Sequence, residues 1–274
     1  MAERTIFDAR AIRNFCNGML PVRTYERIYR NALAAPPGDI VEVGTAHGAA
    51  TVCLALALKD SGRPGKVHTF EKILGGSREA FGGIDENIRI IRRNLDRFGV
   101  ADRVELIIGD VRDEAPEMAG RLKIGALFLD ADGRLERDFG LFFDRLTVGG
   151  LVIIDDVRPA ARLSFVGLKG TSGRFKVDQK HRISRLLLDI FQRHGLVGEG
   201  AFIGPDTWMG HKANGGYASV PVDEIIDAYR ELVFADVEMS MIPGRKVARR
   251  ALKKVLPEVF LDRLRNDREK EQSP

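Results

Sequence analysis

The sequence predicts a doubly wound α/β fold with a mostly parallel, seven-stranded sheet, an N-terminal helical cap and a C-terminal helical tail. One observation predicts the parallel strands and a second predicts a ligand-binding edge: strand-like and helix-like segments alternate from Asp39 to Asp156, and each of the five strand-like segments carries an acidic residue at or near its end. Strands that alternate with helices form right-handed βαβ units, whose strands are parallel. A third observation predicts an antiparallel edge, because the apolar segments 198–203 and 207–211 flank Gly204-Pro205-Asp206 as in a β-hairpin.

The N-terminal cap is predicted over residues 1–38. Apolar side chains recur at helical spacing from Tyr25 to Leu33. Pro36-Pro37-Gly38 then stops the helical pattern. The chain is therefore expected to enter the sheet at Asp39.

The sheet domain is predicted over residues 39–215. Arg158–Phe175 interrupts its regular order, because this segment is rich in Gly, Ser and Lys, as expected of a mobile loop over the ligand crevice. Strands are expected at 39–43, 67–71, 104–108, 126–130 and 151–155, and helices at about 48–60, 84–98, 113–121, 135–146 and 178–194.

The C-terminal region, residues 216–274, is predicted to hold two helices, at about 221–238 and 244–266. Between Gly244 and Lys270 the chain has ten basic and four acidic residues, a charge of +6, so with a total of +4 the rest of the chain has a charge of −2. A body of this charge is not the electrostatic footprint of a nucleic-acid-binding protein. The basic, amphipathic tail is expected either to contact an anionic membrane or a second subunit, or to be a solvated terminal helix.

The composition excludes several classes of protein. The two cysteines, Cys16 and Cys53, form no CxxC pair and have no zinc-site spacing. The N-terminus lacks the apolar core of a signal peptide, and apolar runs are shorter than the roughly 18 residues that cross a bilayer. We therefore expect a cytoplasmic protein that does not span the membrane, with peripheral membrane contact as an option for the tail.

Acidic residues gather at the predicted carboxyl edge of the sheet. Ligands of open α/β sheets bind at the carboxyl ends of the strands, and the five strand-like segments end at or near Glu42, Glu71, Asp110, Asp130 and Asp156. Carboxylates crowded on one edge repel one another unless a cation or a donor-rich ligand lies among them. The sequence therefore predicts a bound ligand, and with it a metal ion.

A glycine turn follows the first strand. In Glu42-Val-Gly-Thr-Ala-His-Gly48, Gly44 permits a tight turn and close approach of a ligand, and Gly48 opens the next helix. The dinucleotide fingerprint G-x-G-x-x-G places its glycines differently, so the spacing argues against NAD. Glu71 is placed to accept the hydroxyls of a ribose. For Asp110 two interpretations stay open, contact with an adenine edge and a helix N-cap.

These motifs, with Gly109-Asp110 and Leu129-Asp-Ala-Asp132, resemble the ordered motifs of class I S-adenosylmethionine-dependent methyltransferases. Phe128–Asp132 and Val148–Asp156 are similar to the cation-dependent O-methyltransferases, which include the catechol, caffeoyl-coenzyme A and macrolide-sugar enzymes. The resemblance covers residues 39–156 and implies the strand order 3-2-1-4-5 with a terminal hairpin. It also implies that S-adenosylmethionine is bound by Glu42, Gly44, Thr45, Gly48, Glu71, Asp110 and Asp130.

The resemblance further implies a divalent-cation site. Asp130, Asp155 and Asp156 match the carboxylate or amide ligands of the cation-dependent group, and hard oxygen ligands suit Mg²⁺. Such an ion lowers the pKa of an acceptor hydroxyl and orients two vicinal oxygens. The alternative interpretation is that Asp155 and Asp156 cap the loop after the fifth strand.

The resemblance implies Asp130 and Asp132 as catalytic residues. Asp132 matches the second acid of the sugar-methylating relatives and is a candidate base or further ligand. The catechol-type enzymes place a lysine base three residues after the first metal aspartate, where this chain has Gly133. A sugar or glycan unit is therefore favoured over a catechol. Further candidate bases, without a supporting spacing, are Arg134, Lys169, Lys176 and His181, of which His181 is expected to be a solvated helix residue.

Taken together, these patterns predict a cation-dependent O-methyltransferase that acts on a small hydroxylated acceptor, and a homo-oligomer is an option for its assembly. The alternatives are a metal-independent methyltransferase and a binding or scaffolding protein that keeps the fold without catalysis. The aromatic side chains Phe139, Phe142 and Phe143 are expected in the core. Trp208 is expected to be a core anchor or a wall of the acceptor pocket.

Overall fold

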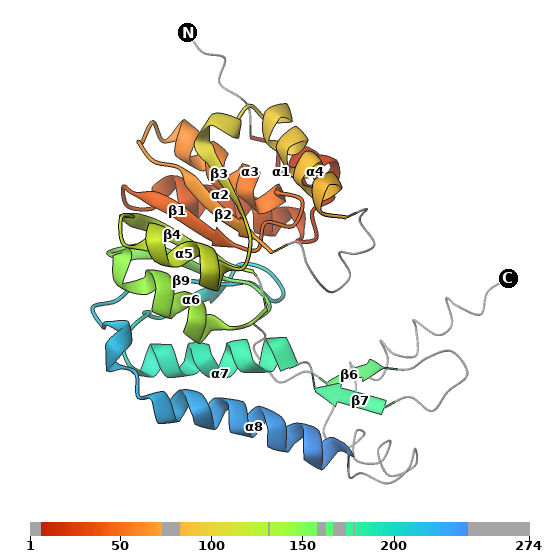
Figure 1. The fold of residues 1–274 in the computed structure, drawn as a ribbon, viewed down its shortest axis with the longest axis vertical. Coiled ribbons are helices and arrows are strands. Elements are labelled where there is room, and N and C mark those ends of the chain that lie inside the picture. The colour runs from red at the N-terminus through yellow and green to blue at the C-terminus, as the bar shows by residue number, and fades with distance from the viewer. Residues whose placement is uncertain are drawn as a thin grey trace, which may run out of the picture. The chain divides into compact units, whose positions relative to one another are not determined.

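The computed structural model describes residues 7–72, 83–130, 132–157, 163–166, 174–177 and 179–240. The chain divides into two compact units. The first comprises Met1–Arg162 and Gln179–Tyr229, and the second comprises Leu163–Asp178 and Arg230–Pro274. The first unit contains the seven-stranded sheet (Figure 1).

The first unit is built on a seven-stranded sheet with the order β3-β2-β1-β4-β5-β9-β8. The pairs among β1 to β5 are parallel, and β9 runs antiparallel to both β5 and β8. The strands are β1 Asp39–Val43, β2 Val67–Glu71, β3 Val104–Ile108, β4 Ile124–Leu129, β5 Leu146–Ile154, β8 Ala201–Phe202 and β9 Trp208–His211. The predicted fold class, strand order and antiparallel edge are confirmed.

The strand β5 begins five residues earlier than the sequence predicted. Leu146 pairs with Ile124, and a register shift separates this pair from the regular pairing that starts with Ala126 and Leu151. Gly149, in the left-handed region with φ +76°, lies in the irregular part. The two glycines in Thr147–Gly150 concealed the extension, because glycine weakens a strand pattern.

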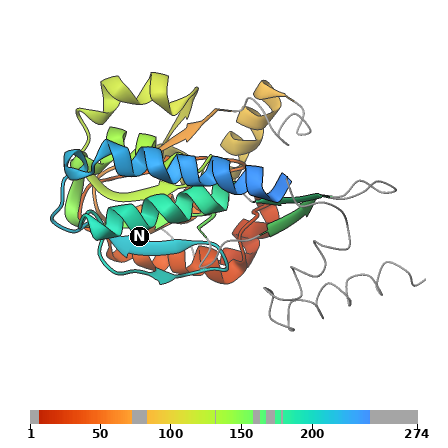
Figure 2. The same cartoon turned by 90° about the horizontal axis from the view of Figure 1, so that it is seen from below.

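Helices cover both faces of the sheet. On one face α3 packs against α1, α2 and α4, and on the other α6 packs against α5 and α7. Figure 2 shows the red N-terminal helices and the yellow-green α5 on opposite sides of the sheet. The described helices are α1 Ala9–Phe15, α2 Val22–Ala34, α3 Ala49–Asp60, α4 Ile84–Arg97, α5 Val111–Ala119, α6 Leu135–Phe142, α7 Gln179–Arg193 and α8 Val222–Ser240.

Two apolar layers hold these helices to the sheet. The helix α3 is buried along nearly its whole length, from Ala49 to Leu58, under the N-terminal helices. On the opposite face Phe139 stacks with Phe143 and with Phe191, at ring-centroid distances of 4.9 and 4.5 Å. The predicted core positions of the three phenylalanines are thereby confirmed.

The predicted helical cap consists of α1 and α2. Asp8 begins α1 by accepting hydrogen bonds from the backbone N–H groups of Arg10 and Ala11. Between the two helices the chain turns through Asn17, which has φ +49°. This turn brings residues 16–20 to the carboxyl edge of the sheet, where they line a pocket.

The expectation of a loop over Arg158–Phe175 was wrong for six residues. Within the second unit, β6 Leu163–Val166 and β7 Arg174–Val177 form an antiparallel pair. Both segments alternate apolar and other side chains with the period of a strand, a signal that the surrounding Gly, Ser and Lys residues concealed. The rest of that segment, and the predicted helix at 244–266 with its basic tail, lie outside the described residues.

The helix predicted at 221–238 is confirmed as α8. Within the described part of the chain, we find no helix that is long and apolar enough to cross a membrane.

Candidate active site

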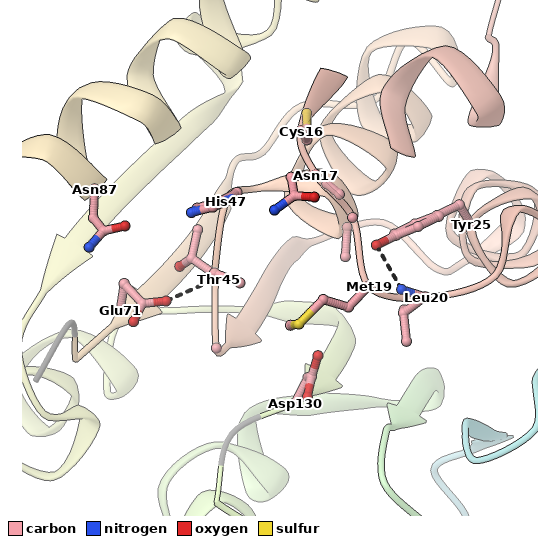
Figure 3. Close-up of a pocket in the computed structure, with 15 residues that line it drawn as sticks. Cys16, Asn17, Met19, Leu20, Tyr25, Thr45, His47, Glu71, Asn87 and Asp130 are labelled. Atoms are coloured by element: carbon pink, nitrogen blue, oxygen red, sulfur yellow. Dashed lines mark hydrogen bonds between the residues drawn. The ribbon is translucent and has the colours of Figure 1, made fainter. Parts of the chain in front are cut away.

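A pocket opens at the carboxyl ends of β1, β2 and β4 (Figure 3). In Figure 3, Glu71 and Asn87 stand on one side, Met19 and Leu20 on the other, and Asp130 below them. The pocket is lined by Cys16, Asn17, Gly18, Met19, Leu20, Tyr25, Gly44, Thr45, Ala46, His47, Ala49, Ala50, Glu71, Asn87 and Asp130. The predicted ligand crevice therefore exists as a pocket.

The glycine turn between β1 and α3 forms the floor of this pocket. Gly44 and Gly48 adopt φ values of +105° and +82°, which an L side chain rarely adopts. Ala46, between them, is also left-handed, with φ +49°. The amide of Asn94 donates to the carbonyl of His47 at 2.7 Å, which ties the turn to α4. Gly44, Thr45, Ala46 and His47 of the turn line the pocket beside the start of α3.

Glu71, at the end of β2, is buried and faces the turn. Its exposed fraction is 2%, and its Oε2 accepts the backbone N–H of Ala46 at 2.7 Å (Figure 3). A carboxylate fixed in this way on the wall of a pocket suits the hydroxyls of a ribose. Its burial shows that Glu71 is not a surface acid.

Glu42 is fully buried and is connected to the wall of the pocket by hydrogen bonds instead of lining it. Its Oε2 accepts the hydroxyls of Thr51 and Thr69, each at 2.6 Å. The hydroxyl of Thr69 also lies 2.6 Å from that of Thr45, which lines the pocket. Burial raises the pKa of Glu42 to about 8, so the carboxyl is neutral at pH 7. The structure therefore assigns Glu42 a supporting position beneath Thr45 rather than a place on the pocket wall.

Asp110 begins α5 as its N-cap, accepting the backbone N–H of Arg112 at 3.0 Å. Its carboxylate also pairs with the side chains of Arg112 and Lys72. Hydrogen bonds from Arg112, followed by those from Lys72, hold the pKa of Asp110 well below its usual range. The N-cap interpretation is confirmed by this geometry, and a contact with adenine remains a prediction.

An acidic cluster lies next to the pocket, at the ends of β4 and β5. Carboxylate oxygens of Asp130, Asp155 and Asp156 all lie within 4.8 Å of one another. The backbone places these residues: the N–H of Asp155 donates to the carbonyl of Leu129 at 2.9 Å, and Asp156 adopts φ +56°. The structure thus brings together the three residues for which the sequence predicted a metal site.

The chemistry of this donor set fits Mg²⁺. Two oxygens bound to one Mg²⁺ at about 2.1 Å lie at most about 4.2 Å apart, which is close to the spacing in the cluster. Asp155 has an exposed fraction of 8% and accepts the hydroxyl of Thr207. Burial raises the pKa of Asp155, and the charge of Asp156 raises it further. The hydrogen bond from Thr207 acts in the opposite direction, and the net shift is upward. A cation in the cluster would offset that repulsion.

Two basic side chains from α7 already face the cluster. Lys180 Nζ lies 3.6 Å from Asp130 Oδ1 and forms an ion pair with Asp156 Oδ2. Burial acts to lower the pKa of Lys180. The carboxylates of Asp130 and Asp156 favour its charged form more strongly, so the pKa of Lys180 is raised. His181 Nε2 lies 3.0 Å from Asp156 Oδ1, so the expectation of a solvated His181 was wrong.

Asp132 is directed away from the cluster. Its two carboxylate oxygens pair with Arg137, at 2.9 and 3.1 Å, and its side chain is 56% exposed. Burial raises the pKa of Asp132, but Arg137 lowers it more, and the net shift is downward. Of the other candidate bases, Arg134 pairs with Glu136. Lys169 and the side chain of Lys176 lie outside the described residues.

Trp208 is a core residue, with an exposed fraction of 3%. Gly200 and Gly210 make room for its ring, because a Cβ at either position would lie 2.3 Å from an indole carbon. The predicted role of Trp208 as a core anchor is confirmed.

Comparison with known proteins agrees with this geometry. Residues 41–157 match the model of a family described as a methyltransferase domain. The chain is 32% identical to a catechol O-methyltransferase from Mycobacterium tuberculosis over 117 residues, which cover 43% of this chain and 46% of the relative. It is also 32% identical to a protein-L-isoaspartate O-methyltransferase from Hyperthermus butylicus over 125 residues, or 43% and 44% of the two chains. The chain thus spans less than half the length of the curated relatives it matches.

The fold also matches that of solved structures. The O-methyltransferase TomG from Streptomyces achromogenes, solved in complex with S-adenosylmethionine, superposes with a TM-score of 0.54 at 16% identity. The match covers 78% of this chain and 91% of TomG. At this identity the similarity concerns the fold.

Proposed function

We propose that this chain, whose residues 41–157 match a family of methyltransferase domains, is a class I enzyme that transfers a methyl group from S-adenosylmethionine to a hydroxyl oxygen. In this reaction the acceptor hydroxyl loses its proton and the oxygen attacks the methyl carbon. The bond between that carbon and sulfur breaks, which leaves S-adenosylhomocysteine and a methyl ether. The enzyme contributes mainly the alignment of oxygen, carbon and sulfur.

The observation that carries this proposal is the position of Asp130. It lines the pocket together with Gly44 and Glu71, and it is also a member of the acidic cluster. A cofactor whose ribose lies at Glu71 and whose sulfonium points toward Asp130 would present its methyl group to an acceptor beside the cluster. Donor and acceptor sites would then adjoin at one residue.

The cluster supports a divalent cation as part of the function. Asp130, Asp155 and Asp156 would hold it, and Mg²⁺ suits their oxygen donors. When bound, such an ion supplies Lewis-acid activation of the acceptor hydroxyl. The chain itself fixes the carboxylates, through the hydroxyl of Thr207 and the backbone bond between Asp155 and Leu129.

For the acceptor we propose a small molecule with vicinal hydroxyls, such as a sugar or glycan unit. Gly133 occupies the position at which catechol-type enzymes, by resemblance, have their lysine base. The names of the two curated relatives refer to catechol and to protein isoaspartate, two chemically different acceptors. The residues around the cluster, rather than the shared domain, are therefore expected to select the acceptor.

Two measurements on the full chain test this function. Calorimetric titration with S-adenosylmethionine should show one site per chain, and the absence of binding at millimolar cofactor would favour a non-catalytic scaffold. Transfer of a labelled methyl group to a panel of sugars, glycans and catechols should then identify an O-methylated product. Turnover should fall on addition of a chelator and return with Mg²⁺, whereas unchanged turnover would favour a metal-independent methyltransferase.

A further inference from the structure

The helix α7 places an ammonium group within the acidic cluster. Lys180 Nζ contacts Asp156 Oδ2 and lies 3.6 Å from Asp130 Oδ1. Two of the three acids that would bind a divalent ion therefore face this lysine. Its side chain is 29% exposed, so the ammonium is partly withdrawn from solvent and its attraction to the carboxylates is screened less than at the surface.

Gly133 provides the space through which Lys180 reaches the cluster. Gly133 has φ +81°, and a Cβ added there would lie 3.1 Å from Lys180 Cγ and 3.1 Å from Ser184 Oγ. A side chain at position 133 would therefore press on the aliphatic part of Lys180. The glycine on the loop after β4 and the lysine on α7 thus form one packing arrangement.

A divalent ion and the ammonium group would compete for the same oxygens. Lys180 uses Asp156 Oδ2, while His181 Nε2 lies 3.0 Å from the other oxygen, Oδ1. An ion that bound Asp156 would therefore share an oxygen with one of these contacts or displace it. Two cations within a few ångströms of each other also repel, most strongly where solvent is partly excluded.

We propose that Lys180 is a tethered counter-cation of the acidic cluster, which competes with a divalent ion for Asp130 and Asp156 and thereby lowers the affinity of the cluster for that ion. The inference rests on the metal site of the proposed function. The ammonium holds the carboxylates together, and the ion enters as the lysine side chain swings away. Lys180 is accordingly a residue that sets ion affinity, and no catalytic step is assigned to it.

Binding of Mn²⁺ by the full-length protein tests this competition without any assay of activity. Free Mn²⁺ would be counted by electron paramagnetic resonance in titrations of the wild type and of Lys180→Met, which keeps the aliphatic chain and removes the charge. Lys123→Met is the matched control, because Lys123 is exposed and precedes β4 at the opposite end from Asp130. Lys180→Arg keeps a positive charge at position 180.

We expect Lys180→Met to bind one Mn²⁺ per chain at least about tenfold more tightly than the wild type, and Lys123→Met to bind as the wild type does. Lys180→Arg should remain weak. The gain should disappear in Lys180→Met/Asp156→Gly, since glycine keeps the left-handed backbone at position 156 and removes the carboxylate. A gain of binding cannot result from misfolding.

Equal or weaker Mn²⁺ binding by Lys180→Met would overturn the proposal, and so would a gain that persists without the Asp156 carboxylate. Titration of the same samples with S-adenosylmethionine separates this failure from that of the proposed function. Cofactor binding with no effect of Lys180 on Mn²⁺ would refute only the competition. The absence of cofactor binding would refute the methyltransferase function itself.

Discussion

The cofactor pocket and the acidic cluster lie at the same edge of the sheet and share Asp130, but they are built differently. The pocket depends on backbone conformation: the left-handed turn from Gly44 to Gly48 and the bond from Ala46 to Glu71 come from adjacent strands. The cluster depends on charge, with three carboxylates from β4 and β5 facing Lys180 and His181 from α7. In the proposed function, the donor would bind where backbone conformation shapes the wall, and the acceptor would bind where charged side chains do.

Replacement of Asp130 by Ala should have the largest effect, because this residue belongs to both sites. Loss of this carboxylate as a metal ligand, and of the alignment it provides, should remove several kcal/mol of transition-state stabilisation. The methyl-transfer rate should therefore fall about 1000-fold or more. The affinity for S-adenosylmethionine should change by less than about tenfold. Single-turnover kinetics and calorimetry would measure the two effects separately.

The control for Asp130 is Asp189→Ala, since Asp189 is a partly exposed residue of α7 that pairs with Arg185. We expect this variant to keep the wild-type rate. If Asp130→Ala lost only cofactor affinity and kept its rate at saturating cofactor, Asp130 would belong to the pocket alone and the two sites would not be coupled.

Replacement of Glu71 by Gln should affect the pocket selectively. A hydrogen bond to a charged group contributes about 1.5–3 kcal/mol, so the Kd for S-adenosylmethionine should rise by about 10- to 100-fold. The rate at saturating cofactor and the affinity for Mn²⁺ should stay close to those of the wild type. Calorimetric titration checks the first expectation, with Glu117→Gln, an exposed residue of α5, as control.

A parallel loss of Mn²⁺ affinity in Glu71→Gln would contradict the separation of the two sites. An unchanged Kd for the cofactor would place the ribose elsewhere.

The buried Glu42 gives a smaller, pH-dependent effect on stability. The pKa of this carboxyl is raised by burial to about 8, so the folded state binds a proton that the unfolded state releases above about pH 4.5. The stabilisation is present at low pH and is lost as the pH rises through 8. Between pH 7 and 9 the wild type should lose about 1.4 kcal/mol through this group.

Glu42→Gln, which keeps the shape without the titration, should lack this decline in denaturant titrations at pH 7 and 9. Near pH 4, where the glutamate is neutral in both states, its free energy of unfolding should lie within about 1 kcal/mol of the wild-type value. If the two proteins showed parallel pH profiles of stability, Glu42 would be ionised in the folded state. The assignment of a neutral carboxyl beneath Thr45 would then be wrong.

Asp132 should have the smallest effect, although it is only two residues from Asp130. Its carboxylate is more than half exposed and pairs with Arg137, and exposed ion pairs contribute about 0–1 kcal/mol. Asp132→Asn should therefore change the methyl-transfer rate and the Mn²⁺ affinity by less than about threefold. A loss of either by about 100-fold would show that Asp132 joins the cluster during the reaction.

The parts of the molecule that sequence reasoning predicted are those with local causes. The parallel strands and the turn from Gly44 to Gly48 follow from alternating apolar segments and from glycine spacing, and the strand order was implied by the resemblance. Asp155 and Asp156 were also predictable, because they end a strand that was itself predictable. In these regions the motif and the structure it forms are adjacent in the chain.

The parts that sequence reasoning missed depend on how distant elements pack. Lys180 and His181 reach the cluster only because α7 packs on α6, and no spacing connects position 180 with Asp130. Asp132 pairs with Arg137, which lies on α6. The resemblance had suggested instead that Asp132 is a base or a further ligand of the cluster. Gly133 was noted as a missing lysine, but its role as space for Lys180 appears only in three dimensions.

Anomalous diffraction from a crystal of the full chain, soaked with S-adenosylhomocysteine and Mn²⁺, would test most directly whether donor and acceptor sites meet at Asp130. We expect the nucleoside in the pocket with its ribose at Glu71, and a manganese peak bounded by Asp130, Asp155 and Asp156, with the ammonium of Lys180 displaced. A manganese peak remote from Asp130, or a nucleoside bound outside the turn from Gly44 to Gly48, would contradict this arrangement.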